Sequence, residues 1–317
     1  MSKTWTRRKV LGAAAASGAA IALGSSFPAP AIAQSKKLTY WGGLIFSDDA
    51  NQLLTDTIND WGKQNNISTE VVMINQNETT QKVSAAVASG GMPDALDVGL
   101  GLALLLGRQG QFTLVDDLYK KIGDAQGGWY PGADKASDFT EAAGGRVGIP
   151  FGVNGNLLLR RKDVLEPAGF KDAPKTWDEL VSQATAVNAP PLFGLGLALS
   201  NVGDGNLQMS VLQSFGGRIA DDAGKTVTIK SDATKQYLSW VKDAWDKGLF
   251  PPGNTTWDGA GDNQAYLSGQ AVFIANTGSV GIAAKGDDPE LFNDSAFSAL
   301  PGGPEGVISP IDVQLRV

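Results

Sequence analysis

Carboxylates, amides and aromatic rings are the side chains through which this chain of 317 residues could act, because it has no cysteine and no histidine. Without histidine it lacks the commonest general base, the commonest transition-metal ligand and any Ser-His-Asp triad. Without cysteine it lacks thiol nucleophiles, disulfides and the residue that carries a bacterial lipid anchor. Aspartate and glutamate total 33, so glycoside hydrolysis by two carboxylates stays an alternative, although no pair stands in a recognisable catalytic motif. We therefore predict that the protein is not an enzyme and needs no metal or cofactor.

The first 33 residues have the layout of an export signal. A basic segment containing Arg7-Arg8 precedes a weakly apolar segment at residues 13–23, and small residues at positions 31 and 33 precede Gln34. The apolar segment is too short to span a bilayer, and the order of the three parts is typical of a twin-arginine-type signal peptide. We predict export to the periplasm, a mature chain that starts near Gln34, and no lipid anchor.

The charge and length of the remaining chain limit its partners and its organisation. Loss of Lys3, Arg7, Arg8 and Lys9 with the signal changes the formal charge from −7 to −11. An acidic surface argues against nucleic acid and anionic membranes, since both attract clustered lysine and arginine. A mature length of about 284 residues suits two domains better than one core.

Strand and helix patterns alternate along the first half of the chain. Residues 38–41, 68–74 and 95–98 are short apolar or β-branched segments, which predict strands. Residues 49–63, 79–89 and 103–108 have helical spacing of apolar side chains, with Gly90-Gly91 ending the second of these helices. This βαβαβ order predicts a mostly parallel sheet with helices on both faces.

A second unit is predicted from about residue 146 onwards. Thr176 and Glu179 have the spacing of a capping box, in which each side chain bonds the other residue's amide. Residues 233–247 place Tyr237, Trp240 and Trp245 on one helical face, and Gly248 follows as the expected C-terminal cap. A short helix at 264–268 and an apolar strand at 271–275 follow.

Five stretches resemble the extracellular solute-binding proteins of ABC importers, in the large group that includes the maltose-type sugar binders. They are Trp-Gly-Gly at 41–43, Gly-Met-Pro-Asp at 91–94, Gly-Ile-Pro-Phe at 148–151 with the segment 157–161, the run from 161 to 180 containing Lys-Thr-Trp-Asp-Glu, and Tyr-Leu-Ser-Gly-Gln at 266–270 with Leu-Pro-Gly-Gly at 300–303. The resemblance covers most of residues 36–304. It implies a two-lobe α/β fold with mostly parallel sheets, a ligand cleft between the lobes, a small-molecule solute, membrane permease subunits as partners, and a monomer.

The resemblance also implies domain boundaries and one departure from the family. We expect a first lobe at residues 34–150, a second lobe at 151–304 and the start of a return crossover at 305–317. Members of the family usually continue for roughly a hundred residues beyond the Pro-Gly-Gly turn, so we expect either a sequence that lacks its C-terminal portion or a reduced variant of the family. Such a loss would expose apolar faces.

A sugar ligand needs flat apolar surfaces for its C–H faces and many hydrogen-bonding groups for its hydroxyls. In this fold ligands lie at the carboxyl ends of the strands. The side chains expected there are Trp41, Phe46, Asp48, Asn77, Glu78 and Asp97 in the first lobe, Asn154 at the crossover, and Asn206, Gln208, Trp257, Asp258, Asn276 and Ser279 in the second lobe.

Several of these residues have a structural alternative. Trp41 can belong to the core, Asp48 can cap the next helix, one of Gln76, Asn77 and Glu78 can serve as a cap, and Asp97 can be a satisfied buried carboxylate. Four other tryptophans, Trp61, Trp177, Trp240 and Trp245, lie on helix faces and are expected in the core.

The alternative ligand of the same fold is a cation such as a polyamine. It would need aromatic walls and several carboxylates, which Asp48, Glu78, Asp97 and Asp258 could supply. Ferric iron is not expected, because the five tyrosines include no adjacent pair and histidine is absent. The leading prediction is a periplasmic binding protein that delivers a carbohydrate to a membrane importer.

Overall fold

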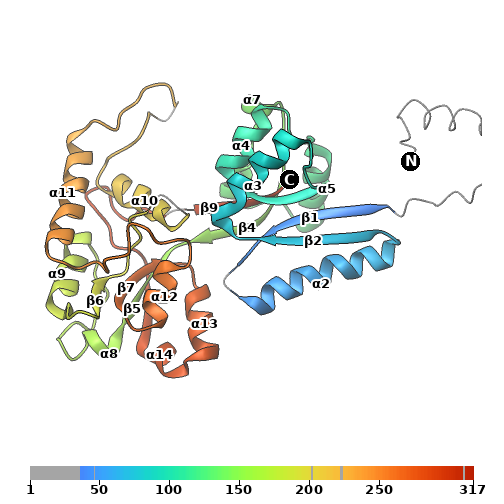
Figure 1. The fold of residues 1–317 in the computed structure, drawn as a ribbon. Coiled ribbons are helices and arrows are strands. Elements are labelled where there is room, and N and C mark those ends of the chain that lie inside the picture. Colours follow the sequence, from blue (N-terminus) through green and yellow to red (C-terminus); the bar gives the residue numbers. More distant parts are fainter. Residues whose placement is uncertain (1–35, 46, 201–202, 222–223, 310) are drawn as a thin grey trace, which may run out of the picture. The chain divides into compact units, whose positions relative to one another are not determined.

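A computed structural model describes residues 36–45, 47–200, 203–221, 224–309 and 311–317 (Figure 1). The predicted signal at 1–33 and the predicted ligand residue Phe46 lie outside this part of the chain. No helix among the described residues is long and apolar enough to cross a membrane.

The first lobe is built on a five-stranded sheet with the order β2-β1-β3-β9-β4. Its first three strands are parallel neighbours, because a helix connects each to the next and returns the chain to the same end of the sheet. The elements are β1 (Lys37–Gly43), α2 (Asp48–Asn65), β2 (Ser68–Ile74), α3 (Gln76–Ser89), β3 (Ala95–Gly99), α4 (Leu100–Arg108), α5 (Asp116–Gln126), α6 (Pro131–Ala136), α7 (Thr140–Ala143) and β4 (Ile149–Gly155), with β9 (Ile311–Arg316) from the end of the chain.

The second lobe is built on a four-stranded sheet with the order β6-β7-β5-β8. Every residue of its strand β7 is buried, which accords with the unbroken apolar run in the sequence. The elements are β5 (Leu157–Arg161), α8 (Lys162–Leu165), α9 (Trp177–Val187), β6 (Phe193–Leu195), the 3₁₀ helix η1 (Gly203–Asn206), α10 (Leu207–Ser214), α11 (Asp232–Asp246), α12 (Gly261–Leu267), β7 (Ala271–Asn276), α13 (Ser279–Asp287), α14 (Pro289–Asp294) and β8 (Ser295–Ser298).

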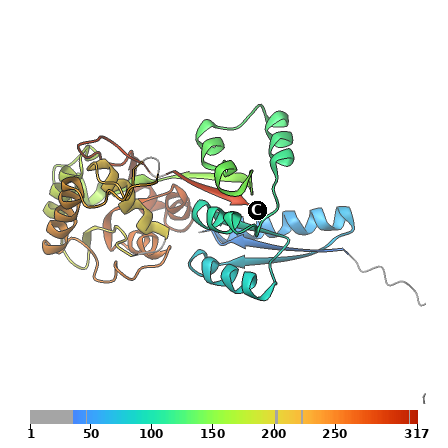
Figure 2. The same ribbon diagram turned by 90° about the horizontal axis from the view of Figure 1, so that it is seen from above.

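The prediction of mostly parallel sheets is wrong. Of the described pairings, β1 with β2, β1 with β3, and β6 with β7 are parallel, whereas β9 is antiparallel to β3 and β4, and β5 is antiparallel to β7 and β8. The chain leaves the first sheet through β4 and re-enters it through β9, so these two strands run in opposite directions side by side (Figure 2).

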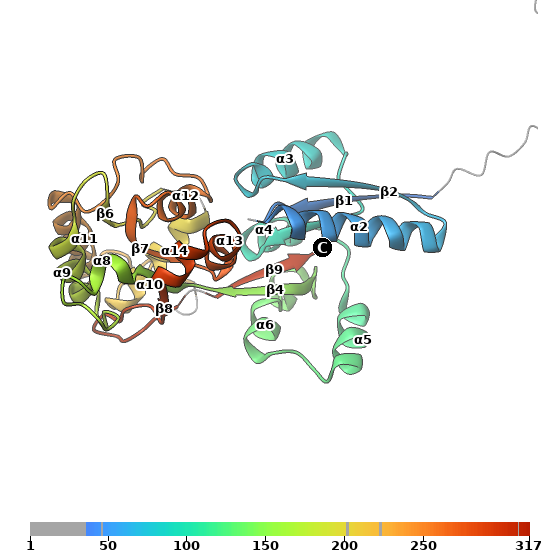
Figure 3. The ribbon, with the colours of Figure 1, turned by 90° about the horizontal axis from the view of Figure 1, so that it is seen from below.

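The predicted boundary between residues 150 and 151 falls inside β4. This strand pairs with β9 as far as Gly155, opposite Ile311 (Figure 3). Only Asn156 separates β4 from β5, and its carbonyl accepts a hydrogen bond from the Ser309 hydroxyl at 3.4 Å. The chain therefore remains part of the first sheet for five residues beyond the predicted boundary. A hydrogen bond links the two segments that connect the sheets.

Each lobe has its own apolar core. Val83, Leu96, Val98, Leu106 and Leu315 are among the buried residues of the first lobe. The second lobe has a larger cluster, in which the indoles of Trp177 and Trp240 meet edge to face at 5.6 Å. A smaller cluster beneath α12 and α13 includes Leu159, Tyr266 and Ile274.

Candidate functional site

The carboxyl ends of β1, β2 and β3 meet at one edge of the first sheet, because the three strands are parallel. Residues 44–48 follow β1, residues 75–78 follow β2, and α4 begins directly after β3. Most of the predicted first-lobe residues belong to these connections.

Asp48, Asn77 and Glu78 are exposed at this edge, in the first turns of α2 and α3. None of them is the helix cap, since Ser47 accepts from the Ala50 amide at 3.3 Å and Asn75 accepts from the Asn77 amide at 3.0 Å. The Glu78 carboxylate contacts the Lys82 ammonium at 2.9 Å. The side chains of Asp48 and Asn77 thus remain directed to the surface at the edge where a ligand is expected.

Trp41 lies inside β1 and not beyond its end. The strand continues through Gly43, and Trp41 pairs with Val72 on one side and Leu96 on the other. Its half-buried indole packs against the first-lobe core. The glycines that follow extend the strand because their partners in β2, Met73 and Ile74, continue the ladder.

Asp97 is a buried carboxylate that is hydrogen-bonded within the protein. This is the structural alternative to its predicted role as a ligand residue. It accepts from the Tyr40 hydroxyl and from the Arg316 Nε, the latter at 2.8 Å. The guanidinium of Arg316 also lies 4.3 Å from the ring centroid of Phe151. Burial and the hydrogen bond to Asp97 raise the pKa of Tyr40. This cluster joins β1, β3, β4 and β9.

The carboxyl ends of β6 and β7 form the corresponding edge of the second sheet. Asn276, at the end of β7, donates from its amide to Asp262 at 2.8 Å and to Asn263, and its Oδ1 accepts from the Thr277 amide. All three polar side chains are buried, with Asp262 only 2% exposed. Buried polar groups are stable only when satisfied, so this network rigidly shapes the edge.

Ser279 and Trp257 flank that network. The Ser279 hydroxyl, in the first turn of α13, hydrogen-bonds the Thr277 hydroxyl at 2.8 Å and is partly exposed. Trp257 is partly buried against the cluster beneath α12, and the absence of a side chain at Gly261 lets the indole approach, since a Cβ there would lie 2.3 Å from it. Asp258 is exposed, and its Oδ1 accepts from the Ala260 amide at 3.0 Å.

The other predicted residues have differing surroundings. Asn154 is exposed on β4, opposite Asp312 of β9, and Asn206 is exposed at the start of α10 without a capping bond. Gln208 is buried, because α10 turns this face inward, and its amide bonds the Ala198 carbonyl and the Tyr237 hydroxyl, both at 3.0 Å. The amide of Gln208 is thus committed to the interior and does not belong to a ligand surface.

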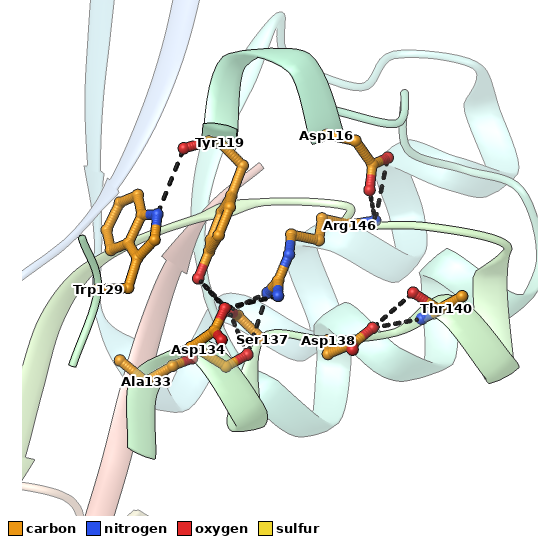
Figure 4. Close-up of polar contacts among 9 residues, drawn as sticks. All are labelled: Asp116, Tyr119, Trp129, Ala133, Asp134, Ser137, Asp138, Thr140 and Arg146. Atoms are coloured by element: carbon orange, nitrogen blue, oxygen red, sulfur yellow. Dashed lines mark hydrogen bonds and ion pairs between the residues drawn. The ribbon is translucent and has the colours of Figure 1, made fainter. Parts of the chain in front are cut away.

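A separate polar cluster surrounds Arg146 in the first lobe (Figure 4). Its guanidinium donates to Asp134 Oδ1 at 2.6 Å and to Ser137 Oγ at 2.8 Å, and lies 3.8 Å from the ring centroid of Tyr119. Trp129 stacks on the other side of Tyr119 with centroids 4.5 Å apart. This cluster packs α5 against α6, and none of the predicted ligand residues belongs to it.

Neither a surface groove nor a cluster of acidic side chains in the described part of the chain extends the candidate ligand site. A surface groove of about 790 Å³ lies between α9 and α11, and Val181, Phe215 and Trp240 are among the residues that line it. None of the predicted ligand residues lines this groove. Within the described ranges no group of three or more acidic residues is close enough to hold a metal ion.

Asn51, Gln76, Asp262 and Asn263 were missed as residues that shape the two edges. Asn51 and Gln76 bond backbone atoms of the segment after β1, and Asp262 and Asn263 bond Asn276. Each lies in the first or second turn of a helix that begins near a strand end. Polar residues in such turns are a signal that sequence inspection could have used.

The chain belongs to the family of bacterial extracellular solute-binding proteins, whose model matches residues 56–312. This match confirms the predicted family. A putative binding protein of Brucella abortus (strain 2308) is 24% identical over 165 residues, which are 51% of this chain and 39% of that protein. A probable ABC transporter-binding protein of Deinococcus radiodurans is 25% identical over 169 residues, 50% of this chain and 40% of that protein. The chain thus spans about two fifths of the length of the curated relatives it matches.

Solved structures confirm the two-lobe fold. Maltose-bound MalE3 of T. maritima has a TM-score of 0.75 with 23% identity, covering 88% of this chain and 71% of that one. A solute-binding protein of an ABC transporter from Thermotoga lettingae, bound with α-D-tagatose, has a TM-score of 0.78 with 20% identity, covering 89% and 72%. An Arthrobacter chlorophenolicus sugar transporter protein with bound laminaribiose has a TM-score of 0.75 with 18% identity, covering 88% and 70%.

Proposed function

We propose that this protein is the solute-binding component of an ABC importer, exported to the periplasm by a twin-arginine-type signal, and that its ligand is a carbohydrate. The observation that carries the proposal is the pair of parallel-strand carboxyl edges, one in each lobe, in a member of the extracellular solute-binding family. Structurally similar proteins are recorded with maltose, tagatose and laminaribiose.

The solute is held between the two edges. Asp48 and Asn77 contact it from the first lobe, and Thr277 and Ser279 contact it from the second, with Trp257 and Asp258 beside them. Contacts to both lobes stabilise a closed form, which membrane permease subunits then recognise. The protein acts as a monomer, forms no covalent intermediate and hydrolyses no glycoside.

A polyamine is the less favoured ligand. Of the four carboxylates that could bind a cation, Asp97 is committed to Arg316 and Tyr40, and Glu78 contacts Lys82. Asp48 and Asp258 remain, which is a small negative charge for a multiply charged ligand.

A thermal-shift series tests the proposal. We expect maltose, D-tagatose, laminaribiose or a related saccharide to raise the melting temperature, while spermidine does not. A ligand at about one hundred times its Kd adds about 2.7 kcal/mol, which corresponds to several degrees. A shift with spermidine alone would change the ligand class, and release of nitrophenol from a chromogenic glycoside would indicate a hydrolase.

A further inference from the structure

The segment after β1 is held by neighbouring side chains. The Asn51 side chain pairs with the backbone of Ile45 on both sides: its Oδ1 accepts from the Ile45 amide at 3.0 Å, and its Nδ2 donates to the Ile45 carbonyl at 2.9 Å. Asn51 itself is buried in the first turn of α2. Because Asn51 is buried in this helix, its side chain can hold the Ile45 backbone in one conformation.

The backbone of Leu44 is bonded by one residue at the end of β2 and one at the start of α3. The Leu44 amide donates to the Ile74 carbonyl at 2.8 Å, and the Gln76 Nε2 donates to the Leu44 carbonyl at 2.8 Å. Every backbone donor and acceptor of Leu44 and Ile45 therefore has a partner, although no regular strand continues there.

The side chains of this segment are nevertheless exposed. Leu44 is 37% exposed and Ile45 is 49% exposed, at the edge where the carboxyl ends of β1 and β2 meet. The backbone of this loop is hydrogen-bonded within the protein, while its apolar side chains are exposed. Such a loop is preorganised, because the conformational entropy of ordering it is lost on folding and not on ligand binding.

We propose that Asn51 is a positioning residue for solute binding: it holds residues 44 and 45 in the conformation that contacts the solute, with Gln76 as a second support. This inference rests on the proposed function. Asn51 itself touches no solute. Its loss would weaken binding because the loop would have to be ordered at the time of binding.

Asn51→Asp gives a reversible test in the full-length protein. An ionised carboxylate can accept from the Ile45 amide but repels the Ile45 carbonyl, whereas a protonated carboxyl group accepts one bond and donates the other, as the amide does. We expect the variant to bind about ten-fold more weakly than wild type at pH 8, and the ratio of the two Kd values to fall toward one as the pH is lowered through the pKa of the introduced carboxyl group.

Two further variants separate this effect from charge and from general damage. Asn51→Ala removes both bonds and should show a weakened affinity that does not recover as the pH is lowered. Asn65→Asp introduces the same charge at the other end of α2, away from the loop, and should match wild type throughout this pH range. The acidic neighbours Asp48 and Asp49 of α2 and Glu78 of α3 are present in every variant, so their titration cancels in the ratio.

Amide hydrogen exchange supplies a readout that needs no ligand. Protection of the Ile45 amide should fall at least ten-fold in Asn51→Ala, which removes the acceptor of that amide, and should stay at the wild-type level in Asn65→Asp. Unchanged protection, or lost protection with an unchanged affinity for the saccharide that shifts the melting temperature most, would overturn the proposal. If no saccharide and no polyamine binds wild type, the proposed function fails, and the exchange pattern alone decides whether Asn51 holds the loop.

Discussion

Asn276 illustrates what decides the role of a single polar residue at a strand end. Its amide hydrogens are used by Asp262 and Asn263, and its oxygen is used by the Thr277 amide. It therefore orients the edge of the second sheet, while the hydroxyls of Thr277 and Ser279 are the groups beside it that a solute can reach. Gln208 was expected at the same edge, but its bonds to Ala198 and Tyr237 place it in the core.

Asn276→Ala should lower the free energy of unfolding by about 1–3 kcal/mol, because it takes one partner from each of two buried polar side chains. Urea unfolding followed by far-ultraviolet circular dichroism measures the change. Asn206→Ala is the matched control, since Asn206 is exposed and makes no capping bond. Equal effects of the two substitutions would contradict the account of this network.

The strand β9 shows how an element remote in sequence completes a lobe. It lies between β3 and β4, and the contact between Arg316 and Asp97 joins residues that are 219 positions apart. The family resemblance implied the start of a return crossover at residues 305–317, but neither the antiparallel pairing nor the buried ion pair can be predicted from spacing within a segment.

Arg316→Ala should destabilise the protein strongly, because the buried carboxylate of Asp97 would lose its positively charged partner and keep only the hydrogen bond from the Tyr40 hydroxyl. Breaking a fully buried pair costs about 3–5 kcal/mol, and the value here should be lower because the Arg316 side chain is 35% exposed. The double variant Asp97→Asn/Arg316→Met should recover much of the loss. Lys235→Ala, at an exposed pair with Asp232, should change stability by no more than about 1 kcal/mol. Urea midpoints for the four proteins check this, and no recovery in the double variant would contradict it.

Helix and strand positions were largely predictable, whereas coverage of their faces was not. The predicted strand at 68–74 coincides with β2, and the predicted helices at 49–63 and 233–247 lie within one or two residues of α2 and α11. The capping box forms in a modified way: Thr176 accepts from the Glu179 amide, but the Glu179 carboxylate bonds the Lys175 amide and not that of Thr176.

The tryptophans expected in the core show the same limit. Trp177 and Trp240 are buried, but Trp61 is 44% exposed and Trp245 is 46% exposed. Periodicity identifies the apolar face of a helix and does not reveal whether another element covers that face. The positions of Asn51 and Asp262 in the first turns of helices were a signal for polar residues at the two edges, but the sequence did not show which atoms they bond.

The buried tyrosines should lower the free energy of unfolding of the whole protein as the pH becomes alkaline. Burial raises the pKa of Tyr237 and of Tyr266 to about 12, and burial also raises the pKa of Tyr40. The raised pKa values mean that above pH 10 the unfolded chain releases protons that the folded protein retains, so stability present below pH 10 is lost as the pH rises.

We expect the urea midpoint to fall between pH 10 and pH 12, with each such tyrosine contributing up to about 1.4 kcal/mol per pH unit. Tyr266→Phe, which removes one ionisable group from the second-lobe core, should make the decline shallower. A midpoint that stays constant over this range, or an equal slope in the variant, would contradict the assignment.

If the proposed function is right, one solute contacts the carboxyl edges of both lobes. Backbone-amide chemical-shift mapping with the saccharide that shifts the melting temperature most tests it directly. We predict perturbations at residues 44–48 and 75–78 of the first lobe together with residues 276–279 of the second. Perturbations confined to one lobe, or centred on the groove between α9 and α11, would contradict the claim.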